Sequence, residues 1–136
     1  MPRKVRAVSK RDVIDYGLQR RALLGDVASG RRTQAEACDA HPHLLLAAKH
    51  YGTPSPVACP VCDRRRLQHV HYVFGQSLGK TSGQAKTATE LAQLDGTRTE
   101  FDVYVVEVCP GCGWNHLIRS YVLGRPADSS LSAADG

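Results

Sequence analysis

The spacing of apolar side chains changes near residue 53. Before that point apolar residues recur every three or four positions, which places them on one face of an α-helix. This pattern predicts three short helices, over residues 9–24, 33–39 and 42–51. The apolar stripe of the first helix consists of Val13, Ile14, Leu18 and Leu23. Thr33 and Glu36 have the spacing of a capping box, and Pro42 suits the first turn of a helix.

Residues 53–56, with the sequence TPSP, are predicted to form a rigid linker, and after them the period becomes two. Alternation of this kind predicts β-strands, here over residues 67–75, 101–108 and 116–124. A long insertion, 76–100, separates the first two strands. Its middle, at about 84–94, is predicted to be helical.

Charge is distributed unevenly along the 136 residues, whose formal net charge is +5. Residues 1–32 carry nine Lys or Arg against three Asp, so the basic character belongs to the N-terminal region. Such a surface can contact phosphate groups or an acidic protein face, or it can serve solubility alone. We expect four segments: a flexible basic arm (1–8), a helical segment (9–52), a sheet-forming segment (57–124) and a disordered tail (125–136).

Four of the five cysteines form two CxxC pairs, CPVC and CPGC, separated by 46 residues. Four thiolates from two tight turns can surround one Zn²⁺ as a tetrahedron. The predicted ligands are therefore Cys59, Cys62, Cys109 and Cys112. The alternatives are a redox dithiol, which is typical of a strand-to-helix turn, and an iron–sulfur cluster, which also takes four cysteines.

Each CxxC pair adjoins predicted strands, which is the layout of a zinc ribbon. The expected fold class is α+β: short N-terminal helices, then a three-stranded antiparallel zinc-ribbon sheet with a helical insertion between strands. Four protein ligands leave no open coordination position, so the ion is expected to be structural rather than catalytic. Cys38, the fifth cysteine, is expected to be a small buried apolar residue.

Five motifs of the sequence resemble those of a known family. They are VIDYGLQRRALL (13–24), AEACDAHPHLLLAAKHYG (35–52), CPVC (59–62), VFGQSLG (73–79) and VEVCPGCGWNHLIRSYVLG (106–124). Over about residues 12–124 the chain resembles a family of small actinobacterial proteins that is catalogued as a domain of unknown function. The resemblance implies an actinobacterial source and supports zinc-ribbon character, but it brings no known activity.

The sequence favours a non-enzymatic binding module. By analogy with other zinc ribbons, we expect an accessory factor on a nucleic-acid machine, RNA polymerase or the ribosome. The candidate contacts with nucleic acid or a partner are Arg64, Arg65, Arg66, Arg20, Arg21 and Trp114, although Trp114 could instead cover the zinc turn. The alternatives are a direct nucleic-acid-binding regulator and an enzyme with a structural zinc ion.

No signal peptide and no apolar run of membrane-spanning length is visible in the sequence, so a cytoplasmic location is expected. An enzyme would need a pair of groups for acid–base chemistry. Asp102 and Glu107 lie five positions apart on a predicted strand and therefore face opposite sides of the sheet. They do not form an obvious pair of this kind.

Overall fold

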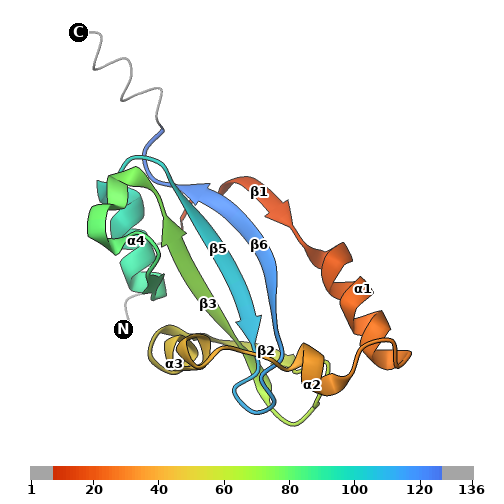
Figure 1. The fold of residues 1–136 in the computed structure, drawn as a ribbon. Helices are drawn as coiled ribbons and strands as arrows, with labels where there is room; N and C mark the ends of the chain where they lie inside the picture. The colour runs from red at the N-terminus through yellow and green to blue at the C-terminus, as the bar shows by residue number, and fades with distance from the viewer. Residues whose placement is uncertain (1–7, 127–136) are drawn as a thin grey trace, which may run out of the picture.

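The computed structural model describes residues 8–126, and its main feature is one antiparallel sheet of six strands. The order across the sheet is β1-β6-β5-β3-β2 (Figure 1). The short β4 also pairs with β3. The strands are β1 (Arg11–Asp15), β2 (Thr53–Ala58), β3 (Arg66–Phe74), β4 (Ala85–Lys86), β5 (Phe101–Val108) and β6 (Asn115–Leu123). The helices are α1 (Gly17–Ala28), α2 (Gln34–Ala37), α3 (Pro42–Tyr51), the 3₁₀ helix η1 (Gln76–Thr81) and α4 (Ala88–Thr97).

The prediction of a three-stranded ribbon preceded by helices is wrong, because the sheet also recruits segments on both sides of the N-terminal helices. Residues 11–15 were expected to be helical, yet they form β1, which pairs with β6 at one edge of the sheet. Val13 and Ile14 are β-branched, which favours a strand over a helix. Both are more than half exposed, so no buried helical face forms there.

The predicted linker at 53–56 is part of another edge strand, β2, which pairs antiparallel with β3. Pro54 and Pro56 cannot donate a backbone hydrogen bond. An edge strand tolerates them because one of its sides has no neighbouring strand. The register shifts between Pro54 and Ala58, so the pairing is irregular where the prolines lie.

Helices α2 and α3 begin close to the positions that the sequence predicts, whereas α1 begins at Gly17, eight residues later than expected. Thr33 and Glu36 form both hydrogen bonds of the capping box at the start of α2. Pro42 occupies the first turn of α3, and the His41 ring accepts the N–H of His43 as a cap. Within the insertion, α4 starts at Ala88, four residues later than expected.

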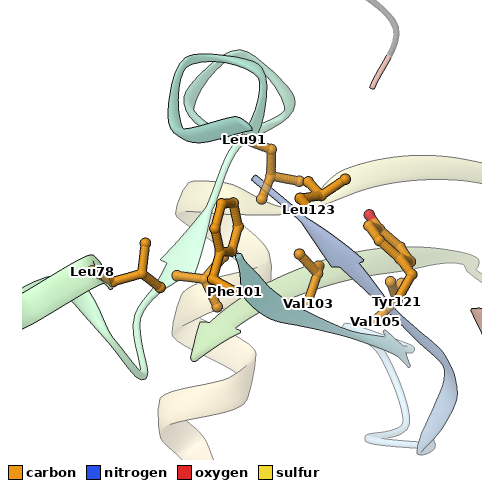
Figure 2. Packing of buried hydrophobic residues seen from close by; sticks show 8 residues of the cluster. Leu78, Leu91, Phe101, Val103, Val105, Tyr121 and Leu123 are labelled. Carbon is orange, nitrogen blue, oxygen red and sulfur yellow. The ribbon is translucent and has the colours of Figure 1, made fainter. Parts of the chain in front are cut away.

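The two faces of the sheet are covered by different helices. On one face, Leu91 of α4 packs over the β5 and β6 side chains Phe101, Val103 and Leu123, and Figure 2 shows these side chains pointing into a single layer. On the other face, Ala48 of α3 packs against Val70 and Val108. β5 lies between β3 and β6 and is the most deeply buried strand.

The predicted flexible arm (1–8) and disordered tail (125–136) lie almost entirely outside the described residues. The described chain begins at Val8, which packs at the edge of the α4 core, and ends just beyond β6.

Candidate metal centre

Two tight turns at one end of the sheet carry the two CxxC pairs. The first knuckle, residues 59–65, joins β2 to β3, and the second knuckle, residues 109–114, joins β5 to β6. β3 and β5 are antiparallel neighbours, and Gln68 lies opposite Val108. The start of β3 and the end of β5 therefore meet at the same end of the sheet, which brings the knuckles together.

The two knuckles repeat one set of hydrogen bonds. The N–H of the second cysteine donates to the first sulfur, and the N–H two residues further on donates to the second sulfur. The pairs are Cys62 N to Cys59 Sγ at 3.5 Å, Arg64 N to Cys62 Sγ at 3.5 Å, Cys112 N to Cys109 Sγ at 3.4 Å and Trp114 N to Cys112 Sγ at 3.4 Å. Backbone N–H groups aimed at sulfur stabilise thiolate charge and fix where each sulfur points.

Each knuckle requires a left-handed backbone at the residue that follows its second cysteine. Asp63 has φ 56° and Gly113 has φ 91°. Aspartate tolerates this region better than most side chains, and glycine adopts it without steric penalty. At Gly113 space is also restricted, because a Cβ would lie 3.0 Å from the carbonyl oxygen of Cys38.

The four sulfurs form a compact cluster. All of them lie within 4.8 Å of one another. Across the knuckles, the Sγ of Cys59 is 3.7 Å from that of Cys112, and the Sγ of Cys62 is 3.6 Å from that of Cys109. A tetrahedron with metal–sulfur bonds of about 2.3 Å has edges of about 3.8 Å, so the geometry fits a single ion. The four cysteines could therefore hold a metal ion.

Burial differs within the cluster. Cys59 and Cys109 are buried, whereas Cys62 and Cys112 are only partly covered. Burial raises the pKa of Cys59 and of Cys112 to about 12, while the backbone N–H of Arg64 lowers the pKa of Cys62 to about 7. A cation that binds here has to displace protons from the sulfurs, so its affinity depends on pH.

The fifth cysteine lies beside this cluster, although no spacing in the sequence links it to either CxxC pair. The Sγ of Cys38 is 3.4 Å from the Sγ of Cys112, and the thiol is half-buried. The segment that carries it is fixed to the second knuckle, since the N–H of Ala40 donates to the carbonyl of Gly113 at 3.0 Å. An odd cysteine in a chain with two CxxC pairs was the one available signal.

Trp114 and Arg20, two of the predicted contact residues, lie against a carboxylate beside the cluster. Trp114 is fully buried, and its indole N–H donates to the carboxylate of Glu107 at 2.7 Å. Arg20 of α1 donates to the same oxygen at 2.6 Å, and Glu107 itself is 4% exposed. Both side chains are therefore engaged inside the protein, and they join α1, β5 and the second knuckle.

The remaining predicted contact residues, Arg21 and Arg64–Arg66, are all exposed. Within residues 8–126 none of their guanidinium groups has an acidic partner within 4.0 Å. A cavity of about 600 Å³ lies beside the first knuckle, and Gln34, Arg64, Arg65 and Gly111 contribute to its lining. The stem of Arg65 crosses to the second knuckle, where a Cβ on Gly111 would lie 2.7 Å from its Cγ.

The register between β3, β5 and β6 places a row of polar side chains on the sheet near the knuckles. The spacing of apolar residues in the sequence does not predict this row. Glu107 pairs with His69 on one side and with His116 on the other. The ring of His116 stacks on Trp114, with centroids 6.1 Å apart. Burial lowers the pKa of His69.

The profile of the "Family of unknown function (DUF5318)" matches residues 7–135. The chain belongs to this family. The resemblance noted in the sequence, to an actinobacterial family of unknown function, is thereby confirmed. Two similar proteins are "Uncharacterized protein Mb0050" of Mycobacterium bovis and "Uncharacterized protein Rv0049" of Mycobacterium tuberculosis. Each is 55% identical over 116 residues, which cover 84% of this chain and 85% of the relative.

No solved structure matches the chain. None of the helices within residues 8–126 has the length and apolar character that a membrane span requires.

Proposed function

We propose that the chain is a non-catalytic binding module stabilised by one Zn²⁺ ion, and that it acts as an accessory factor on an RNA polymerase or a ribosome. In this proposal Cys59, Cys62, Cys109 and Cys112 hold the ion, and the arginines of the first knuckle contact nucleic-acid phosphates. The cysteine cluster supplies the scaffold, while the arginine surface supplies the contact.

The sulfur geometry supports a single ion in a closed coordination site. Four thiolates complete a tetrahedron, so the ion keeps no position for water or substrate. A cluster of several iron atoms would hold its thiolates further apart than sulfurs that all lie within 4.8 Å. Zn²⁺ is the ion that four thiolates in paired knuckles most commonly bind, and it supplies folding free energy.

The observation that carries the proposed contact is the arginine-lined cavity beside the first knuckle. Arg64 and Arg65 line its wall, and Gln34 adds a side-chain amide. Arg66 is exposed next to them and also has no acidic partner among the described residues. Unpaired guanidinium groups on a rigid metal-bound turn suit phosphate oxygens, which they can bind in bidentate fashion.

The direct test is binding to a fluorescein-labelled single-stranded RNA and to a labelled DNA duplex at several salt concentrations. The test variant replaces Arg64, Arg65 and Arg66 with serine. The matched control replaces Lys80, Arg98 and Arg125 with serine, which removes the same charge at the opposite end of the sheet, near the start of β5 and the end of β6. We expect affinity to fall with salt, to fall strongly in the knuckle variant and to stay near wild type in the control.

Two results would overturn the proposed contact. One is an affinity that neither salt nor the knuckle variant changes. The other is an equal loss in both triple variants, which would mean that only net charge matters. The accessory role has its own test, which is co-purification of the tagged protein with polymerase or ribosomal subunits and loss of this association in the knuckle variant.

A further inference from the structure

Five sulfurs, not four, meet at the knuckle end of the molecule. The separation between the sulfurs of Cys38 and Cys112, at 3.4 Å, is shorter than the cross-knuckle separations of 3.6 and 3.7 Å. Cys38 lies at the C-terminal cap of α2 and belongs to neither knuckle. A tetrahedral ion has no fifth place for it, so its thiol remains free beside a metal-bound thiolate.

The backbone holds Cys38 against the second knuckle. Its carbonyl packs on Gly113, and Ala40 donates a hydrogen bond to the Gly113 carbonyl at 3.0 Å. Ala37, the residue before it, is buried in the same cluster as Trp114. The thiol is thus positioned toward Cys112 by contacts on both sides and is not a surface cysteine that meets its neighbour by chance.

Small molecules have a route to Cys112, the ligand member of this sulfur pair. Cys112 is partly covered, and together with Cys62 it lines the cavity of about 600 Å³ that Arg64 and Arg65 also border. Cys59 and Cys109, by contrast, are buried. A small polar oxidant that enters the cavity therefore meets Cys112 or Cys62 first, and of these two ligands only Cys112 has a non-ligand thiol within contact distance.

We propose that Cys112 is an oxidation site for hydroperoxides and that Cys38 is its resolving thiol, so that oxidation forms a Cys38–Cys112 disulfide and releases the metal ion. This inference rests on the zinc site of the proposed function. It adds a redox step that the binding module itself does not require.

The step balances with hydrogen peroxide as the oxidant. The Cys112 thiolate attacks one peroxide oxygen, the O–O bond breaks, and Cys112 sulfenic acid and hydroxide form. The Cys38 thiol then displaces the sulfenic oxygen, so that an S–S bond forms and water leaves; hydroxide takes a proton from solvent. The two sulfurs together lose two electrons, which reduce the peroxide to two waters.

Loss of Cys112 as a ligand opens the coordination sphere. A disulfide sulfur is a poor ligand compared with a thiolate, so only Cys59, Cys62 and Cys109 would be left to hold the ion, and they would hold it less tightly. The sulfurs have to approach from 3.4 Å to a bond length of about 2.05 Å, a short movement at the boundary between α2 and the second knuckle.

The test treats zinc-loaded full-length protein with hydrogen peroxide. Released zinc is followed with a colorimetric chelator, and disulfides are mapped by mass spectrometry of a non-reduced digest. We expect the first disulfide to join Cys38 to Cys112, and zinc release to follow its formation. Cys38→Ser should retain zinc before treatment and release it several-fold more slowly. Cys38→Ala, which keeps a small apolar side chain, should behave in the same way and guards against a folding defect in one variant.

The proposal is overturned if the first disulfide joins two ligands, such as Cys59 with Cys112, or if both Cys38 variants release zinc as fast as wild type. A wild-type chain that forms the Cys38–Cys112 disulfide but binds no zinc would overturn the zinc assignment and the release step together. Zinc binding with no role for Cys38 would overturn this inference and leave the proposed function intact.

Discussion

Cys59 illustrates how much one buried sulfur contributes. It is 1% exposed, its Sγ lies 3.7 Å from that of Cys112 on the other knuckle, and its thiol accepts two backbone N–H groups. In the proposed zinc site, replacing it with serine removes one of the four ligands. Zinc binding supplies about 10–16 kcal/mol in small zinc domains, which is comparable to the whole stability of a domain.

We therefore expect Cys59→Ser to lose its metal and the ordered packing of the knuckle end around Trp114. Metal content by mass spectrometry and near-ultraviolet circular dichroism measure the two losses. Cys38→Ser is the matched control, because it removes a neighbouring thiol that is not a predicted ligand. If Cys59→Ser binds one zinc ion as tightly as wild type, the four-thiolate site is wrong.

His71 is a residue whose burial leads to a pH prediction. Burial lowers its pKa to about 4, and the positive charges of His69, Arg119 and Lys10 act in the same direction. Its Nδ1 is buried and has no hydrogen-bond partner within the described residues. The unfolded chain takes up a proton near the ordinary histidine pKa of 6.5, and the folded chain does not. Stability is therefore lost as the pH falls from about 6.5 toward about 4, by at most ~3 kcal/mol.

His71→Leu should flatten this dependence, because it removes the group that protonates on unfolding. The measurement is the free energy of unfolding of both proteins across that pH range. Acidification also removes metal from the thiolates, but equally in the two proteins, so their difference reports on His71. Parallel curves would show that the imidazole is not held neutral by the fold.

At the scale of elements, α1 is attached to the sheet by few contacts. None of its residues is buried, and Leu18 is 73% exposed. The ion pair between Arg20 and Glu107 is its main polar link to the sheet, at 2.6 Å and with Arg20 24% exposed. Leu23, Leu24 and Val27 add apolar contacts at the edge of the cysteine cluster.

Arg20→Met should therefore destabilise the protein by about 2–4 kcal/mol, since it leaves the buried Glu107 carboxylate without its cation while keeping most of the apolar stem. Amide hydrogen exchange over 17–28 should accelerate more than exchange in β5. Arg21→Met is the control, because Arg21 is exposed and has no ion pair among the described residues. Equal effects of the two substitutions would show that the ion pair does not hold α1.

Elements with a local signal could be predicted from the sequence, whereas those that depend on distant pairing could not. The capping box at Thr33 and the proline at 42 encode helix starts within a few residues of chain, and both helices begin there. β1 and β2 carry weak or contradictory local signals. They become strands because β6 and β3 offer them open edges, and the pairing of Ile14 with Ser120 spans most of the chain.

The distinction between local signals and distant contacts also holds at the candidate site. The CxxC spacing is local, so it pointed to the four clustered cysteines. The neighbours of the cluster were not predictable, because Cys38 and Arg20 reach it through tertiary packing across more than 70 residues. Trp114 could not be assigned to the interior or the surface until the register placed Glu107 beside it.

At the scale of the whole molecule, the sheet has a centre of stability at each end, in addition to the cluster of Ala48, Val70 and Val108 under α3. One is the α4 end, where Leu91, Phe101 and Leu123 are almost completely buried without any metal ligand nearby. The other is the knuckle end, where the cluster around the cysteines is completed by Trp114 and Leu67. β3, β5 and β6 run between the two ends, so the centres share strands but not side chains.

Metal removal should therefore affect the molecule unevenly. When a strong chelator extracts the ion, we expect amide exchange to accelerate in both knuckles and in α2, while Val103 and Val105 stay protected, since their packing under α4 involves no thiolate. Hydrogen-exchange mass spectrometry before and after chelation makes the comparison, and reloading with zinc should restore protection. In the metal-free chain the α4 core keeps its own buried apolar side chains, so loss of order at the knuckles need not spread to it. Uniform acceleration along β5 would contradict this, because it would mean that the ion stabilises the entire sheet as one cooperative unit.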